Sequence, residues 1–401
     1  MRDGDRSRRP REASPKGSRT HGATAGAALR HASRTKPMSR RSLPLAPSSE
    51  SRIAIAEAAP QRPEGWGEQG VALTDAHGRR ITYLRASVTD RCNMACVYCM
   101  PPGGEDEHAM RSDVLAFEEL VAITRALAIG GVRRVRLTGG EPLARRDVLR
   151  LVTMLRASAP IDSLAMTTNG VRLATLARPL REAGLDEVNV SIDSLDRDRF
   201  RAITRGGDLD EVLAGVHAAL DAGIVVKINC VALGGLNDDE LGAIVDWSWS
   251  IGVVPRFIEL MPIGEAAALP RERFVAAREI VERLGARVTR DASATKPDGK
   301  GPARYLAAAD GSGREVGFIT AVSDEFCGGC NRVRITSRGE LRACLASRRA
   351  VSLRDLVRAG ASDLDVLWAT AWSLGVKDTG HHFADVHASE HERVGMSLIG
   401  G

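Results

Sequence analysis

Residues 89–101 read TDRCNMACVYCMP, and this stretch sets three cysteines in the spacing C-x3-C-x2-C. Three thiolates this close together can hold three irons of a four-iron, four-sulfur cluster. The fourth iron then lacks a protein ligand, and an open metal position is where a substrate or cosubstrate binds, as it does at catalytic zinc. Cys92, Cys96 and Cys99 therefore indicate a chemically active cluster and not a passive electron carrier.

Two other interpretations of these cysteines are a zinc knuckle and a disulfide pair. Zinc usually takes four ligands, whereas no histidine or fourth cysteine stands beside the three. Disulfide frameworks occur mainly in secreted chains, and we expect no secretory signal here. We therefore favour the iron–sulfur cluster.

The composition bounds the class of protein. The chain has 401 residues, of which 43% are hydrophobic, and this is enough for two ordinary globular domains and a tail. It contains no run of about 18 apolar residues, so we expect no membrane-spanning helix and no membrane partner. Clustered free cysteines indicate a reducing compartment, and we expect the protein in the cytoplasm.

The N-terminal segment differs in texture from the rest. Residues 1–50 hold twelve basic and four acidic residues, a net charge of +8, which leaves −3 for the remainder of a chain whose total is +5. The segment is rich in Ser, Pro, Gly and Arg and cannot bury enough apolar surface to fold, so we predict a disordered basic extension over residues 1–65. An organelle transit peptide and a nucleic-acid-binding arm are the alternatives. Because the remainder is acidic, we expect no nucleic acid partner.

From about Gly70 short β-branched segments alternate with helical patterns, which indicates βα units and a parallel sheet. The predicted strands are 82–88, 132–138, 163–168, 187–193, 224–232 and 254–260. The predicted helices are 117–130, 146–157, 173–183, 210–222 and 238–250. Six units fall short of the eight of a closed barrel, so we predict an α/β fold, an open partial (β/α)6 barrel of the TIM type. Residues 290–315 are predicted to be a loop or linker.

Side chains alternate along a strand, and each predicted strand has an apolar face and a polar face. The apolar face packs on the outer helices, so the polar face looks into the barrel. The predicted inward side chains are Arg85, Ser87, Arg134, Arg136, Thr138, Thr167, Asn169, Asn189, Ser191, Asp193, Lys227, Asn229 and Arg256. A buried polar group without a partner costs about 1–3 kcal/mol. Because bases outnumber acids on this face, we predict an anionic ligand such as a polyphosphate, bound without a P-loop.

A second set of cysteines, Cys327, Cys330 and Cys344, has the spacing C-x2-C-x13-C. One interpretation is a structural zinc site completed by a C-terminal histidine. The candidates are His381, His382, His387 and His391. We expect these histidines to be solvated or on a helix surface, and we favour a second cluster with an open iron. Arg332 and Arg334 follow directly, and guanidinium groups bind phosphates well, so this site is predicted to hold a substrate.

Two glycine pairs occur at informative positions. Residues 138–142 read TGGEP after the second predicted strand, where glycines let the backbone approach a ligand closely and Glu141 can accept an ammonium group. The chain ends in Gly400-Gly401, which is thin enough to thread a narrow site. A frayed end is the alternative for this tail.

Together these motifs resemble the GTP 3′,8-cyclase family, the molybdenum cofactor biosynthesis protein A family of the radical S-adenosylmethionine (SAM) superfamily. The resemblance runs from about Asp75 to Gly401. It is carried by LRASVTDRC at 84–92, RLTGGEPL at 136–143, TTNG at 167–170, NVSID at 189–193, RFIE at 256–259, CGGCNRVR at 327–334 and the final Gly-Gly. One departure is Arg134, where relatives carry lysine, and the two side chains are not equivalent.

The resemblance implies a radical SAM core over residues 66–297 and a C-terminal domain with the second, auxiliary cluster and the Gly-Gly tail over residues 298–401. It implies two four-iron, four-sulfur clusters and SAM as cofactors. One electron cleaves SAM to methionine and a 5′-deoxyadenosyl radical, which takes hydrogen from C3′ of GTP. The C3′ radical then attacks C8 and gives (8S)-3′,8-cyclo-7,8-dihydroguanosine 5′-triphosphate, in the first step of molybdenum cofactor biosynthesis.

Residue roles follow from the resemblance together with the inward faces. The metal ligands are Cys92, Cys96, Cys99, Cys327, Cys330 and Cys344, and the catalytic set is the first three of these with Arg332 and Arg334. The SAM contacts are Tyr98, Gly140, Ser191 and Met261. The GTP contacts are Arg85, Arg134, Arg136, Thr167, Lys227, Arg256, Arg332 and Arg334. The implied partners are an electron donor and cyclic pyranopterin monophosphate synthase, which takes the product, and a homodimer is one candidate assembly.

Two rival functions stay open at the level of the sequence. A radical SAM peptide maturase with an auxiliary cluster usually carries more cysteines than the three found here. A zinc-stabilised nucleic-acid-binding protein conflicts with the acidic balance after residue 50. The seventh cysteine, Cys230, falls on the apolar side of its predicted strand, so we expect it in the core.

Overall fold

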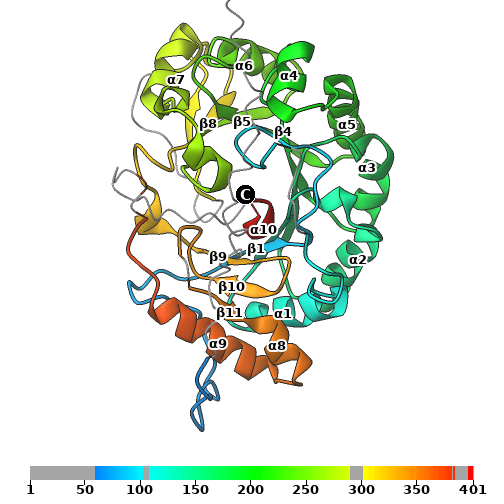
Figure 1. Cartoon of the computed structure of the whole chain (residues 1–401), viewed down its shortest axis with the longest axis vertical. Helices are drawn as coiled ribbons and strands as arrows, with labels where there is room; N and C mark the ends of the chain where they lie inside the picture. The colour runs from blue at the N-terminus through cyan, green and yellow to red at the C-terminus, as the bar shows by residue number, and fades with distance from the viewer. Residues whose placement is uncertain are drawn as a thin grey trace, which may run out of the picture. The chain divides into compact units, whose positions relative to one another are not determined.

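The computed structural model describes residues 59–102, 108–289, 301–347, 349–381, 383 and 396–400 of the chain. The predicted extension over residues 1–65 therefore lies outside the described residues as far as residue 58. Within the described part, eleven strands form one sheet, and most of the helices lie along its outer side (Figure 1).

Six βα units make up the larger part of this sheet. The strands are β1 (Tyr83–Ser87), β2 (Arg134–Thr138), β3 (Ser163–Thr168), β4 (Glu187–Ser191), β5 (Val225–Ala232) and β6 (Val254–Glu259). The helices are α1 (Phe117–Ile129), α2 (Val148–Ser158), α3 (Leu173–Glu182), α4 (Arg197–Thr204), α5 (Leu209–Asp221), α6 (Leu241–Ser250) and α7 (Ala277–Leu284). Consecutive strands pair in parallel. The predicted partial barrel of six units is confirmed.

Side-chain caps fix where several helices begin. The Asp196 carboxylate accepts a hydrogen bond from the Arg199 amide at the start of α4. The Asp208 carboxylate does the same for the Asp210 amide at the start of α5. Each cap satisfies an amide that has no partner inside the helix and stabilises it by about 1 kcal/mol. α4 is short and strongly charged, which explains why apolar periodicity does not predict it.

The C-terminal residues continue the same sheet at both of its ends. At one end β8 (Glu315–Ile319) pairs in parallel with β6, and β7 (Arg304–Ala307) pairs antiparallel with β8. At the other end β9 (Arg332–Ile335) pairs in parallel with β1, followed by β10 (Glu340–Arg342) and β11 (Val351–Ser352). The sheet thus bridges the proposed domain boundary at 297/298, which stays a prediction.

These strands correct one expectation. Residues 290–315 were expected to form a loop or linker, yet β7 and the first residue of β8 fall inside that range, while residues 290–300 lie outside the described part. A run rich in Gly, Ala and Lys hides β7 because its four residues, Arg304–Ala307, show no clear alternation of apolar and polar positions.

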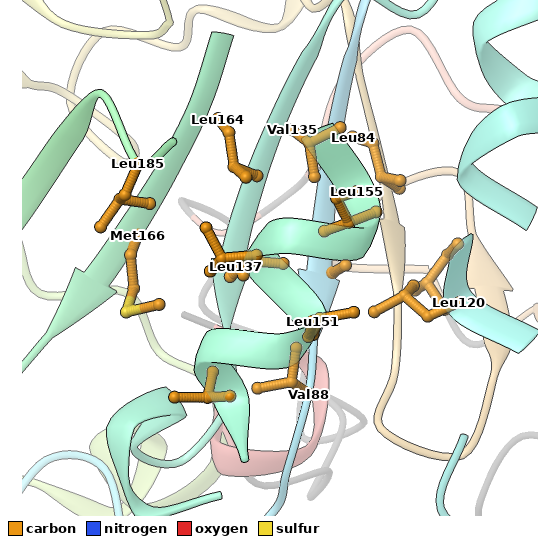
Figure 2. Close-up of a cluster of buried hydrophobic side chains, with 14 of the residues drawn as sticks. Leu84, Val88, Leu120, Val135, Leu137, Leu151, Leu155, Leu164, Met166 and Leu185 are labelled. Atoms are coloured by element: carbon orange, nitrogen blue, oxygen red, sulfur yellow. The ribbon is translucent and has the colours of Figure 1, made fainter. Parts of the chain in front are cut away.

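The core lies between the sheet and its outer helices. Figure 2 shows Leu84 and Leu137 from the first two strands pointing at Leu151 and Leu155 of α2, and all four side chains are buried. Full burial of such a side chain contributes about 1.5–3 kcal/mol. The apolar face of each strand therefore packs outward onto helices, and the opposite face is left to line the interior.

Three more helices follow: α8 (Leu353–Arg358), α9 (Asp363–Gly375) and α10 (Met396–Ile399). α8 and α9 lie beside α1 on the outside, whereas α10 lies inside the ring of strands near β1 (Figure 1). No helix of the described residues is long and apolar enough to span a membrane.

Candidate active site

A cavity of about 300 Å³ opens on the inner face of the sheet. Predicted inward side chains that line it are Arg85, Thr138, Arg136, Thr167, Asn169, Asn189, Ser191, Asn229 and Arg256. Both sets of cysteines also line it: Cys92, Cys96 and Cys99 from the N-terminal half of the chain, and Cys327, Cys330 and Cys344 from the C-terminal part. Two three-cysteine sets and a basic strand face therefore meet in one space.

The first cysteine set follows β1 on a loop. All three thiols are partly buried and form no disulfide. They lie near one another, because charges on Cys99 and Cys92 contribute to the raised pKa of Cys96. Burial raises the pKa of Cys92 to about 11 and also raises the pKa of Cys96. Converging thiols that are costly to ionise alone fit a metal cluster, because the metal replaces the protons.

The glycine pair after β2 holds this loop in place. A β-carbon on Gly139 would lie 2.4 Å from the Thr89 carbonyl oxygen, and one on Gly140 would lie 2.4 Å from the Arg91 carbonyl oxygen. The Gly140 amide donates to that Thr89 oxygen at 2.8 Å. The closest approach of the two glycines is therefore to the backbone before Cys92, so they seat the cysteine loop against β2.

Glu141 joins this loop to the next one. Its carboxylate accepts hydrogen bonds from the Leu143 amide at 2.9 Å, the Thr168 hydroxyl at 2.7 Å and the Asn169 amide at 2.7 Å. Burial raises its pKa. The Asn169 side chain in turn lies 4.0 Å from the Cys92 sulfur. Glu141 thus braces the site, and its predicted contact with an ammonium group stays a prediction.

The four predicted SAM contacts, Tyr98, Gly140, Ser191 and Met261, all line the cavity. Tyr98 donates a hydrogen bond at 2.7 Å to Asp193, whose other oxygen accepts from the Val231 amide at 2.9 Å. Burial raises the pKa of Asp193 to about 6. Asp193 therefore orients Tyr98, which lines the cavity, and is not itself among the lining residues.

In the second cysteine set, Cys327 and Cys330 lie on a short turn that leads into β9, and Cys344 follows β10. The Arg332 guanidinium lies 3.8 Å from the Cys330 sulfur and 4.7 Å from the centre of the Phe326 ring. Burial raises the pKa of Cys330, but the charges of Arg332 and Lys377 outweigh it and lower the pKa to about 7. Burial raises the pKa of Cys327, and charges on Cys344 and Cys330 contribute to the increase, so these three thiols also lie near one another.

His381 differs from its predicted position. It is 7% exposed and stacks on Phe383 with ring centres 4.0 Å apart, so the expectation of a solvated or helix-surface histidine is wrong for this residue. Its ring, the Glu325 carboxylate and the Cys327 sulfur lie within 4.8 Å of one another. His382, His387 and His391 lie outside the described residues.

Three buried arginines, Arg85, Arg256 and Arg334, line the cavity. Burial lowers the pKa of Arg85 to about 10, and it lowers the pKa of Arg334 and Arg256 as well. The charge of Arg85 adds to the lowering at Arg334. Like charges held together out of water are costly, so this arrangement favours a bound anion.

Two predicted GTP contacts are already paired to an acid that sequence reasoning missed. Arg136 donates to Glu187 at 2.5 Å and to the Tyr83 hydroxyl at 2.6 Å, and Lys227 donates to Glu187 at 2.5 Å. Lys227 and Arg134 are not among the residues that line the cavity, and the Arg134 guanidinium lies 5.8 Å from the centre of the Tyr83 ring. Glu187 opens its strand on the polar face, two residues before Asn189, and that alternation is the signal that could have found it.

Some buried polar side-chain atoms that line the cavity have no hydrogen-bond partner within the described part of the chain. Among the described residues, the Thr138 hydroxyl, the Thr167 hydroxyl and the Asn189 carbonyl oxygen have no hydrogen bond. Leaving such a group unpaired costs about 1–3 kcal/mol. All three line the cavity, so the interior fits a polar ligand with several donors and acceptors.

The end of the chain enters the same cavity region. Arg334 and Arg85 donate to the Gly400 carbonyl oxygen, at 2.5 and 3.5 Å. Gly400 has a φ of +70°, and a β-carbon there would lie 2.1 Å from the Thr138 hydroxyl. The prediction that the tail threads a narrow site is confirmed for Gly400, while Gly401 lies outside the described residues.

Comparisons with known proteins decide the family. A model of the radical SAM superfamily matches residues 86–248, and a model described as Molybdenum Cofactor Synthesis C matches residues 253–383. The GTP 3′,8-cyclase of Heliobacterium modesticaldum is 44% identical over 332 residues, which cover 82% of this chain and 100% of the relative. The enzyme of the same name from Pelotomaculum thermopropionicum is 41% identical over 330 residues, with the same coverage. The chain belongs to the GTP 3′,8-cyclase family.

Solved structures agree on the fold. The structure of Streptococcus suis SuiB bound to S-adenosylmethionine matches with a TM-score of 0.51 at 15% identity, over 72% of this chain and 68% of that one. This likeness confirms the radical SAM barrel. Membership of the GTP 3′,8-cyclase family brings four-iron, four-sulfur clusters and SAM as cofactors, and the two converging cysteine sets fit them.

Proposed function

We propose that this cavity is where the chain carries out the GTP 3′,8-cyclase reaction, the conversion of GTP to 3′,8-cyclo-7,8-dihydro-GTP that begins molybdenum cofactor biosynthesis. One observation carries the assignment: both three-cysteine sets and the basic strand face line one cavity. A single radical SAM cluster needs only the first set. The second set and the arginines beside it supply a separate place for an anionic substrate to bind.

Cys92, Cys96 and Cys99 would hold the cluster that binds SAM. Tyr98, fixed by Asp193, and Gly140, fixed against Arg91, would position the SAM molecule. Ser191 and Met261 line the same cavity. When bound, SAM and the reduced cluster supply the radical that removes a hydrogen atom from GTP, while the protein positions the reactants and excludes water.

Cys327, Cys330 and Cys344 would hold the second cluster, with the purine of GTP at its open iron. The triphosphate would bind the basic residues of the inner face: Arg85, Arg134, Arg136, Lys227, Arg256, Arg332 and Arg334. Thr167 offers its unpaired hydroxyl to the same ligand. Arg136 and Lys227 must loosen their bonds with Glu187 if they are to contact phosphate, which makes them the weaker candidates of this set.

Further partners follow from the reaction. Cleaving SAM needs an electron donor, and the cyclic product passes to an enzyme that consumes it, for which we propose cyclic pyranopterin monophosphate synthase. The free cysteines favour work in the reducing cytoplasm. A homodimer stays a candidate assembly.

The first experiment is an anaerobic assay of the reconstituted chain with dithionite, SAM and either GTP or ATP. We expect 5′-deoxyadenosine to form faster with GTP than with ATP, and a cyclised GTP product to appear by mass spectrometry. SAM cleavage that ignores GTP would leave a radical SAM enzyme with another substrate, such as a peptide.

Metal content tests the two-cluster assignment separately. We expect about eight irons per chain in the wild type and about four in Cys344→Ser. Cys230→Ser is the matched control, because Cys230 is 1% exposed in an apolar cluster around β5 and β6 and its loss should leave iron unchanged. Zinc in place of half the iron would favour instead a site made by the second set with Glu325 and His381.

A further inference from the structure

A buried lysine lies against the second cysteine set. Lys377 follows α9, and its side chain is only 2% exposed. Its ammonium nitrogen lies 3.6 Å from the Cys330 sulfur and donates to the Arg332 carbonyl oxygen at 3.0 Å. A fully buried lysine is rare without a close partner, and here its nearest acid, Asp75, is 4.0 Å away. The Cys330 thiolate is therefore the closest anionic partner that the site can offer it.

A turn from the N-terminal part of the described chain holds this lysine in place. Asp75 bonds Arg79 at 2.6 Å, and Arg79 donates to the carbonyl oxygens of Cys327, Thr379 and Asp378 at 2.7–2.8 Å. The Arg79 guanidinium thus clamps the cysteine turn and the loop after Lys377 together. The His77 ring is also hydrogen-bonded to the Lys377 carbonyl oxygen, at 3.0 Å.

The charges of this group do not cancel. Asp75 neutralises one of the two cations, and it lies closer to Arg79 than to Lys377. One positive charge of this group therefore remains beside Cys330, in addition to the charge of Arg332. An unpaired ion in the interior is costly, so the arrangement is favourable when the sulfur carries negative charge, as a metal-bound thiolate does.

We propose that Lys377 is a positioning residue of the second cluster, whose ammonium donates to the Cys330 sulfur and raises the reduction potential of that cluster. Hydrogen bonds and charges next to the sulfurs are known to set the potential of iron–sulfur clusters. A cation stabilises the more negative, reduced form, and Asp75 offsets part of this effect. The inference rests on the proposed assignment of a cluster to Cys327, Cys330 and Cys344.

The proposal predicts shifts of opposite sign for two substitutions. Lys377→Met keeps the length of the side chain but removes its charge and its donors, so the midpoint potential of the second cluster should become more negative. Asp75→Asn keeps the shape but removes a negative charge, so the same potential should become more positive. Lys377→Arg retains the charge and should keep the potential closer to the wild type than Met does.

Potentiometric titration of the anaerobic holoenzyme, followed by electron paramagnetic resonance, measures both clusters at once. The signal missing from Cys344→Ser identifies the second cluster. The first cluster should keep its potential in every variant. Arg80→Met is the matched control, because it removes one charge from the same turn at an exposed position, and it should shift neither cluster.

The outcomes separate this inference from the function on which it rests. A wild type that holds only about four irons would show that the second cluster does not exist. With about eight irons, an unchanged potential in Lys377→Met overturns the role of Lys377. If that variant loses its second cluster, Asp75→Asn decides: a positive shift supports the proposal, and no shift or a second loss of iron shows that the group only holds the turn together.

Discussion

At the scale of single residues, the inner face of the barrel shows what alternation can and cannot predict. The polar face of β2 was expected to offer Arg136 to an anion, and Arg136 does line the cavity. The sequence could not show that Glu187 already engages it, because the partner comes from a strand 51 residues away. Alternation assigns a side chain to a face, whereas the pairing on that face depends on how strands two apart curve toward each other.

Glu187→Gln should destabilise the chain by about 3 kcal/mol near neutral pH, because it leaves the buried Arg136 and the partly buried Lys227 without their shared acid. Glu187 and Arg136 are 11% and 6% exposed, so solvent screens them little. Urea unfolding measures the change. Asp210→Asn is the control, since it breaks a pair with Arg197 in which both side chains are exposed, and it should leave the unfolding midpoint unchanged. An equal midpoint for wild type and Glu187→Gln would show that Glu187 does not hold these cations together.

The pH dependence of that difference has a definite sign. Burial raises the pKa of Glu187, but Arg136 and Lys227 outweigh it and lower the pKa from 4.5 to about 2. A carboxyl with a lowered pKa contributes stability above its unfolded pKa and loses it as pH falls toward its folded pKa. The gap between wild type and Glu187→Gln should therefore be full above about pH 5 and shrink between pH 4.5 and 2. A gap that stays constant in acid would contradict the lowered pKa of Glu187.

At the scale of elements, periodicity found the βα units because their strands are β-branched and their helices are long. It missed α4, which is short and charged, and it missed β7 and β9, whose four residues each are too few to show a pattern. The cysteine motifs still predicted the site, because their spacing is local and can be recognised even where the helices and strands around them are predicted wrongly. The His381 ring, by contrast, is buried by stacking on Phe383, a contact that no local pattern announces.

Helix α5 needs a glycine where it packs against the loop after β3. A β-carbon on Gly215 would lie 2.3 Å from the carbonyl oxygen of Gly170, in the loop that carries Asn169. Gly215→Ala should therefore destabilise the chain by about 1–3 kcal/mol through overpacking, although alanine is the better helix former.

Thermal unfolding tests this, with Gly375→Ala in α9 as the matched control. A β-carbon on Gly375 meets nothing within 4 Å, so the control should be neutral or slightly stabilising. Gly215→Ala as stable as its control would mean that α5 can move away from the loop without cost.

At the scale of the whole molecule, the active site is assembled from both ends of the described chain. β9 pairs with β1 and so brings Arg332 and Arg334 beside Arg85, while Arg79 ties the second cysteine turn to the segment before β1. Such long-range pairing explains why residue patterns alone predict two separate motifs, and why only the family resemblance assigns both to one substrate. Their meeting depends on how the sheet orders its strands.

The same assembly predicts how much of the N-terminal side the fold needs. The Trp368 indole of α9 donates to the Pro60 carbonyl oxygen at 2.7 Å, Arg62 pairs with Asp365 at 2.9 Å, and the Trp66 ring meets the Trp368 ring edge-on at 5.2 Å. A chain that begins at residue 67 loses all three contacts, and a chain that begins at residue 59 keeps them.

The shorter chain should be less stable than the longer one by about 1–3 kcal/mol, the sum expected of one hydrogen bond, one partly exposed ion pair and one aromatic contact. Denaturant unfolding of the two truncated chains measures the difference, and Trp66→Ala in the longer chain should reproduce part of it. Both should still bind about eight irons, because the turn from Asp75 to Arg79 that clamps the second cysteine set is present in each. Equal stability would mean that residues 60–66 rest on α9 without stabilising it, and loss of iron from the shorter chain would mean that α9 transmits its position to the loop of Lys377.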